Sequence, residues 1–208
     1  MSRETFFDAH QRATVEAAMA RMIPTDHEPG AREAGAIEFV DRYLSGIEFI
    51  YANPDGRGFE PLTGKRAEAW RQRIGILRKT YADGIVALDA LSTETFGAAF
   101  HALGEAQQDE ALSSLERLQA GGSGEEGPAL QQTLTETELA FVPLLAMHTR
   151  QGFYSDPIYG GNKGHAGWKV IGFPGPSSLM EVFTGRYSAL PWFAEGEEQK
   201  YLEANRGA

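Results

Sequence analysis

The sequence predicts an all-α fold, an irregular helical domain of about five or six helices. Apolar residues recur every three or four positions along much of the chain, the alternating pattern of strands is weak throughout, and nothing repeats at a fixed longer period. With 208 residues, the chain is long enough for one domain with a complete core. We expect the helical domain to occupy residues 1–176, and the C-terminal extension, residues 177–208, to dock on a partner.

The first two helices follow from apolar spacing. Val15, Ala18, Met19 and Met22 predict a helix over residues 5–23, which Pro24 ends. A second helix is predicted up to the turn at residues 53–56, because apolar residues again recur at helical spacing: Ile37, Val40, Leu44 and Ile47. Residues 55–65 contain four Gly or Pro residues and predict a loop that Phe59 pins to the core.

A long helix is predicted over residues 66–91, either continuous or kinked at Gly84. Its apolar residues recur every three or four positions: Trp70, Ile74, Leu77, Tyr81, Ile85 and Leu88. Ser92 or Thr93 can cap a short helix that continues through Leu103. Residues 105–119 predict a further helix with an acidic outer face, and residues 121–128, GGSGEEGP, have the composition of a linker.

The last long helix is predicted to begin at Thr135, which forms a capping-box pattern with Glu138. Pro143 lies too far inside this helix to be a first-turn proline, so the helix either begins later or kinks there, and we favour the kink. Beyond Pro176, residues 179–183 fit one or two helical turns. The rest of the tail carries aromatic residues without a long periodic element.

Residues 148–176 combine seven glycines with five large aromatic residues: Phe153, Tyr154, Tyr159, Trp168 and Phe173. A flexible linker has no use for rings that lose free energy by staying in water, so we expect an ordered irregular segment. Within it, Asp156 is predicted to accept hydrogen bonds from amides two residues on, Asn162 to supply a side-chain amide or to take a left-handed turn, and Trp168 to be the main anchor. The rings either complete the chain's own core or dock on another chain, and the two can coexist.

Composition excludes several kinds of function. A net charge of −10 and a pI near 5 argue against binding to nucleic acid or to anionic membranes. The absence of cysteine excludes disulfides, Cys-ligated zinc, iron–sulfur clusters and thioether-linked haem. Apolar runs fall short of the roughly 20 residues of a membrane helix, and the N-terminus lacks a signal core. We therefore expect a cytoplasmic protein, or a periplasmic one if a signal is removed or a partner exports it.

One resemblance is specific. The run GFYSDPIYGGN, the GW pair after it and IGFPG resemble, in this order, the subunit 3 (small subunit) family of gluconate 2-dehydrogenase and related flavin-dependent sugar and polyol dehydrogenases. The resemblance implies a non-catalytic accessory subunit that assembles, stabilises or matures a large flavoprotein of the glucose-methanol-choline type. That partner would carry FAD and oxidise alcohol groups of a sugar, sugar acid or glycoside. It implies no cofactor on this chain, and a cytochrome c subunit as a further candidate partner.

Residues 152–193 carry nine large aromatic side chains but little regular structure in which to bury them, so we expect a hetero-oligomer. We expect partner contact or loop structure at fourteen positions: His148, Phe153, Tyr154, Asp156, Pro157, Tyr159, Gly160, Gly161, Asn162, Trp168, Phe173, Pro174, Trp192 and Phe193.

The alternative is a stand-alone metal-dependent enzyme, because His148, Asp156 and His165 are close in sequence and could form a two-histidine, one-carboxylate set. Their spacing matches no compact motif such as HExxH. The simpler interpretation is a helix-end His148, a turn at Asp156 and an exposed His165. Dinucleotide binding by the glycines is disfavoured, because neither GxGxxG nor GxxxxGK[ST] occurs. No nucleophile motif such as GxSxG occurs either.

Overall fold

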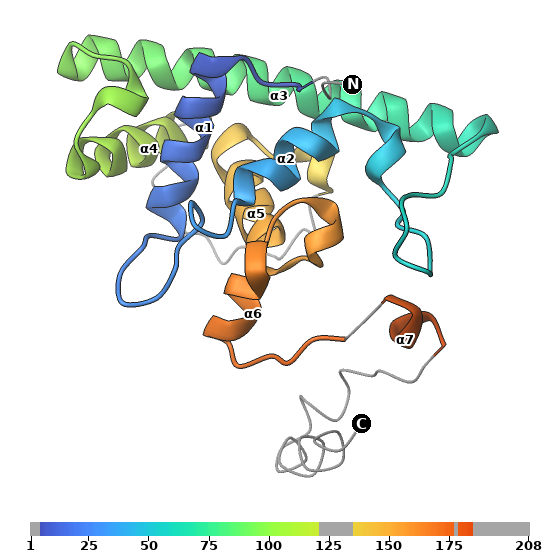
Figure 1. Ribbon diagram of the computed structural model, residues 1–208. Coiled ribbons are helices and arrows are strands. Elements are labelled where there is room, and N and C mark those ends of the chain that lie inside the picture. The colour runs from blue at the N-terminus through green and yellow to red at the C-terminus, as the bar shows by residue number, and fades with distance from the viewer. Residues whose placement is uncertain (1–4, 121–134, 177–178, 185–208) are drawn as a thin grey trace, which may run out of the picture.

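The computed structural model describes residues 5–120, 135–176 and 179–184 (Figure 1). These residues form seven α-helices and no strand, which confirms the all-α prediction. The α-helices are α1 (Ala9–Met22), α2 (Ala36–Ser45), α3 (Gly64–Phe96), α4 (Glu105–Gln119), α5 (Phe141–Tyr154), α6 (Ala166–Val170) and α7 (Leu179–Phe183). Short 3-10 helices connect them: η1 (Ile47–Phe49), η2 (Phe100–Ala102), η3 (Glu136–Glu138), η4 (Pro157–Tyr159) and η5 (Lys163–His165).

Helix α5 lies at the centre of the fold. It packs against α1, α2, α3, α4 and α6, while α3 spans the whole width of the molecule above the others (Figure 1). The largest fully buried side chains come from α1, α2, α3, η2 and α5: Met19, Ile37, Leu44, Leu77, Tyr81, Leu88, Phe100, Leu144, Leu145 and Phe153. Among the described helices, none combines the length and the apolar character that crossing a bilayer requires.

Helix α3 is longer than predicted. It continues to Phe96, so Ser92 and Thr93 lie inside its last turns instead of capping a new helix. Gly97 ends it in a left-handed conformation, φ 79°, and donates its N–H to Thr93 O. The short helix predicted to run through Leu103 is therefore wrong, and only η2 forms there.

The start of α5 also differs from the prediction. The capping box of Thr135 and Glu138 is present, but it caps η3. Helix α5 begins at Phe141, so Pro143 lies in its first turn, where a backbone N–H has no partner within the helix. The favoured kink at Pro143 is wrong, and the later start is correct. Of the predicted C-terminal extension, the structure describes α7 and Thr184, and Trp192 and Phe193 lie outside the described residues.

Gly84 lies where α3 crosses the start of α5. Helix α3 is continuous through Gly84 and has no break there. A Cβ added at Gly84 would lie 2.1 Å from Cγ of Phe141, so only glycine allows this close approach. Gly75, on the same helix, has no atom within 4 Å of its added Cβ. The two glycines therefore differ in packing and share the same helical backbone.

We expect opposite effects from alanine at these two positions. Gly84→Ala should lower the free energy of unfolding by about 1 to 3 kcal/mol, because the methyl group overpacks the contact with Phe141. Gly75→Ala should raise it by up to about 1 kcal/mol, because alanine favours the helix without a clash. Urea unfolding followed by circular dichroism measures both. A Gly84→Ala protein as stable as Gly75→Ala would contradict the crossing described here.

Candidate functional site

The glycine- and aromatic-rich segment folds back over the C-terminal end of α5. Phe153 and Trp168 are buried, 2% and 7% exposed, and Trp168 donates its indole N–H to Tyr154 O at 2.7 Å. The His165 ring stacks on Trp168 with 4.9 Å between centroids, and Phe173 meets it edge-on at 5.4 Å. The segment is therefore ordered, as predicted. Of the two expectations for its rings, the first holds for Phe153 and Trp168, which complete the chain's own core.

Two polar side chains fix the backbone of this segment. Asn162, at φ 49°, donates its amide to Ser155 O at 2.8 Å and accepts the Gly167 N–H at 2.9 Å. Asp156 accepts the Ile158 N–H at 2.9 Å and so begins η4. Asp156 and Asn162 thus make the kind of turn contacts that the sequence predicted, and Trp168 is buried; the structural role of each stays a prediction.

The glycines of this segment allow close contact with α5. A Cβ on Gly161 would lie 2.0 Å from the carbonyl oxygen of Gly152, and one on Gly167 would lie 2.0 Å from that of Phe153. Both distances are far inside van der Waals contact, so any larger residue would push the segment away from the helix. The segment is also joined to the start of α2, because Lys163 donates its N–H to Ala34 O at 2.9 Å.

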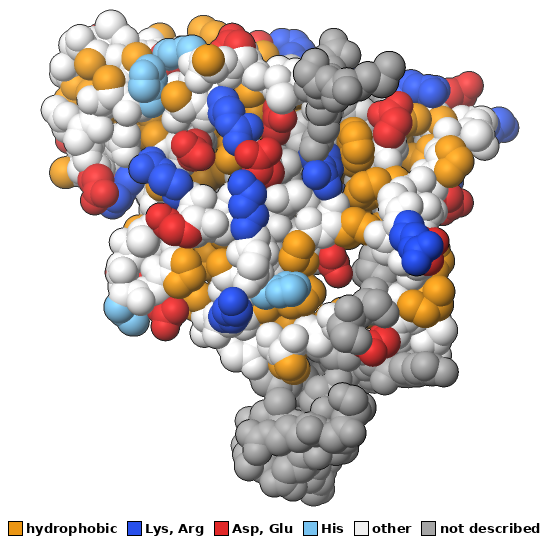
Figure 2. Space-filling view, in the orientation of Figure 1, with side chains coloured by type: hydrophobic (Ala, Val, Ile, Leu, Met, Phe, Trp, Pro, Cys, Tyr) orange, Lys and Arg blue, Asp and Glu red, His pale blue; other side chains and the backbone are white. Residues whose placement is uncertain are grey.

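Other aromatic residues of the segment face outward into a pocket of about 720 Å³. Seven aromatic side chains line it: Phe39, Tyr43, Phe49, Tyr51, Trp70, Tyr154 and Tyr159. Its polar lining includes Arg73, Glu136, Arg150 and Gln151. In Figure 2 hydrophobic side chains gather on the right of the view, over the region where Figure 1 shows the start of α3 and the chain after α2. We call this the aromatic pocket.

The rings of the aromatic pocket support one another. Trp70 meets Tyr43 and Tyr51 edge-on, at 6.4 and 6.0 Å between centroids. Phe59 packs between Phe49 and Tyr159, at 5.4 and 5.8 Å. It therefore holds the loop after α2 against these half-buried rings, and not against the core as predicted. Edge-to-face pairs of this kind each contribute about 0.5 to 1.5 kcal/mol beyond their burial. The walls of the pocket are thus formed before anything binds there.

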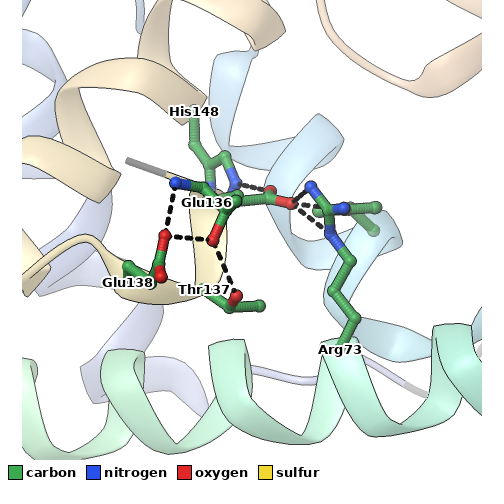
Figure 3. Close-up of polar contacts among 7 residues, drawn as sticks. Arg73, Glu136, Thr137, Glu138 and His148 are labelled. Carbon is green, nitrogen blue, oxygen red and sulfur yellow. Dashed lines mark hydrogen bonds and ion pairs between the residues drawn. The ribbon is translucent and has the colours of Figure 1, made fainter. Parts of the chain in front are cut away.

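A buried carboxylate, Glu136 on η3, lies in the wall of this pocket (Figure 3). Its side chain is 6% exposed; one oxygen lies 2.5 Å from Nε2 of His148, and the other accepts Nε–H of Arg73 at 2.5 Å. The Tyr43 hydroxyl donates to that second oxygen at 3.0 Å. Figure 3 shows Arg73 reaching Glu136 from α3 while His148 approaches from the other side. We call these groups the Glu136 network.

His148 connects this network to the core. It is fully buried, its ring stacks on Tyr81 with 5.7 Å between centroids, and its Nδ1 lies 2.9 Å from the Tyr81 hydroxyl. Because an ionised carboxylate only accepts hydrogen bonds, Nε2 of His148 carries the hydrogen shared with Glu136. His148 was predicted as a helix-end residue, and this is wrong: it lies inside α5, two turns after its start.

The sequence matches the family described as gluconate 2-dehydrogenase subunit 3 over residues 9–175. The chain belongs to this family. No curated protein and no solved structure matched it. The matched range begins with α1 and includes every residue that lines the aromatic pocket. Membership makes the chain one subunit of a multi-subunit dehydrogenase complex, so partners in a hetero-oligomer are expected.

Electrostatics in this subunit-3 chain favour an ionised Glu136. Burial opposes ionisation, but the hydrogen bonds and charges of His148 and Arg73 outweigh it, so the pKa of Glu136 is lowered. Burial, reinforced by the negative charge of Glu136, raises the pKa of Tyr43 and of Tyr81. Glu136 therefore stays charged and both hydroxyls stay protonated at neutral pH.

The Glu136 network is arranged to support structure. Both Glu136 oxygens are occupied, and His148 has no exposed surface with which to reach a substrate. A general acid or base needs an accessible atom within hydrogen-bond reach of the reacting group. What the network can do is hold α2, α3 and α5 in one arrangement and so fix the walls of the aromatic pocket.

The metal-ligand set of the alternative hypothesis does not form. His148 is inside the core, Asp156 caps η4 and His165 stacks on Trp168, and the three side chains do not gather into a ligand group.

Three residues of the Glu136 network were not predicted from the sequence: Arg73, Glu136 and Tyr43. Trp70 and Arg73 share one face of a predicted helix, but no local pattern pairs Arg73 with Glu136, 63 positions later.

Because its pKa is lowered in the folded state, ionised Glu136 stabilises the fold, and this stabilisation depends on pH. Its contribution is complete above the unfolded pKa, about 4.3, and is lost as pH falls through the lower folded pKa. Glu136→Gln should lower the free energy of unfolding by about 2 to 3 kcal/mol near neutral pH, because charge-assisted hydrogen bonds are weakened. The difference from wild type should then narrow as the pH falls below about 4.

Urea unfolding across this pH range measures the difference. Glu110→Gln, at an exposed position on α4, is the matched control and should change stability by less than about 0.5 kcal/mol. A loss of stability for Glu136→Gln that stays the same at every pH would contradict the ionised network.

Proposed function

We propose that this chain is the non-catalytic accessory subunit of an FAD-dependent dehydrogenase of the glucose-methanol-choline type, and that the large flavoprotein docks in the aromatic pocket. In this proposal the large subunit holds FAD and the catalytic groups, and it oxidises alcohol groups of a sugar, sugar acid or glycoside. The small subunit assembles, stabilises or matures it. Family membership supports the complex, and the aromatic pocket is the observation that carries the docking site.

The pocket has the character of a protein-binding site. Aromatic residues and arginine are the side chains most enriched among those that dominate binding energy, and both line this pocket. Tyr154 is 39% exposed, whereas its neighbour Phe153 is buried. The Glu136 network and the paired rings already hold the walls of the pocket in place. Such preorganisation favours tight association, because less conformational entropy is lost on binding.

The lining also indicates the chemistry of the occupant. Seven rings around one hollow suit one or two large apolar side chains of the partner, inserted as anchors. Arg150 is exposed on the edge of the pocket and is positioned to pair with a carboxylate next to such an anchor. We therefore propose that an apolar segment of the flavoprotein with an adjacent acidic residue fills the aromatic pocket.

Co-purification of the flavoprotein with the tagged full-length chain tests this proposal. The complex should show flavin absorbance, and the chain purified alone should show none after gel filtration. Tyr154→Ala and Arg150→Ala should each weaken the complex about tenfold or more, because a hot-spot truncation costs upward of about 1.4 kcal/mol. Affinity is measured by titrating the flavoprotein onto the immobilised chain.

Leu118→Ala is the control, because Leu118 is 66% exposed on α4 and does not line the pocket. It should bind as wild type does. Circular dichroism melting checks that every variant is folded. Folded pocket variants with unchanged affinity would refute the docking site, and flavin retained by the chain alone would refute the division of roles between the subunits.

A further inference from the structure

Three side chains of the types that can ligate a metal, from distant parts of the sequence, meet on the surface away from the aromatic pocket. They are His10 on α1, Asp89 on α3 and His101 on η2, and one ligand atom from each lies within 4.8 Å of the other two. Nε2 of His10 is 2.7 Å from Oδ2 of Asp89, and the two imidazole rings meet edge-on with 5.0 Å between centroids. Figure 2 shows histidine side chains together at the upper left, where Figure 1 shows the start of α1 beside α3.

The carboxylate of this group is held in place by the backbone. Its second oxygen, Oδ1 of Asp89, accepts the Phe100 N–H at 2.9 Å. Phe100 is fully buried, and its carbonyl oxygen accepts the side-chain amide of Gln108 at 3.2 Å. The residue next to His101 is therefore fixed to α3 and α4 at once. Metal-binding carboxylates are usually oriented by such a second hydrogen bond, which leaves the other oxygen for the ion.

The ligand types favour a divalent transition metal. Two imidazoles with one carboxylate suit Zn²⁺, whose bonds to such ligands are about 2.0 to 2.2 Å long. Ligand atoms around a tetrahedral ion would be about 3.3 Å apart, so side-chain rotations would bring the present group into position. The His10 side chain is 51% exposed and His101 is exposed, so an ion can enter from water and such rotations are open to both histidines.

We propose that His10, Asp89 and His101 form a Zn²⁺ site that fastens α1 to α3 and η2. The ion replaces the hydrogen bond between His10 and Asp89 with bonds to all three side chains. Its remaining coordination positions are filled by water. The site is a structural clamp on the first helix of the family fold and shares no residue with the aromatic pocket, so it stands independently of the docking proposal.

Isothermal titration of Zn²⁺ into the untagged, EDTA-treated full-length chain at neutral pH tests this proposal. We expect saturation at one ion per chain and a higher melting temperature with the ion. His10→Ala and His101→Ala should each weaken binding tenfold or more, and both positions are exposed, so the variants should remain folded by circular dichroism.

His27→Ala is the matched control. His27 is an exposed histidine, 3.4 Å from the carboxylate of Asp26, but it lacks a second histidine beside it. Its variant should bind Zn²⁺ as wild type does. Failure of the wild-type chain to bind one ion would overturn the proposal. So would His10→Ala and His101→Ala proteins that bind Zn²⁺ as tightly as wild type does.

Discussion

The buried negative charge of Glu136 constrains how three helices of this fold pack together. Glu136 has almost no contact with water, and an isolated carboxylate in that position would cost several kcal/mol. The charge is tolerated because a histidine, an arginine and a tyrosine converge on it from α5, α3 and α2. These helices must therefore keep one mutual arrangement, and that arrangement forms the walls of the aromatic pocket.

Helix α5 contacts both the Glu136 network and the glycine-rich segment. In its middle, His148 holds Glu136 and stacks on Tyr81 in the core. At its C-terminal end, the carbonyl groups of Gly152 and Phe153 lie against the glycine-rich segment so closely that a Cβ there would clash. The segment thus turns Trp168 inward and leaves Tyr154 facing the pocket. Trp168 therefore belongs to the core, and in our proposal the docking interpretation rests on outward-facing rings such as Tyr154.

Local sequence patterns predicted those helix bounds and turns that depend on residues close together in the sequence. The bounds of α4 and the turn contacts of Asp156 and Asn162 match the prediction, because periodicity and turn chemistry act over a few positions. The extension of α3 was missed because residues that favour caps can also occupy the last turns of a helix. The Glu136 network was missed because Tyr43 and Glu136 are 93 positions apart. The two-histidine cluster at His10 and His101 joins three elements and was missed for the same reason.

Hydrogen–deuterium exchange of the chain, alone and with the large flavoprotein, tests the central claim that the aromatic pocket is the docking site. Backbone amides report where a partner slows local opening. We expect new protection in residues 49–51, which line the pocket, and in the stretch 150–159, which contributes five lining residues, with little change in α4. Protection confined to α1 and α4, with the pocket segments unchanged, would contradict it.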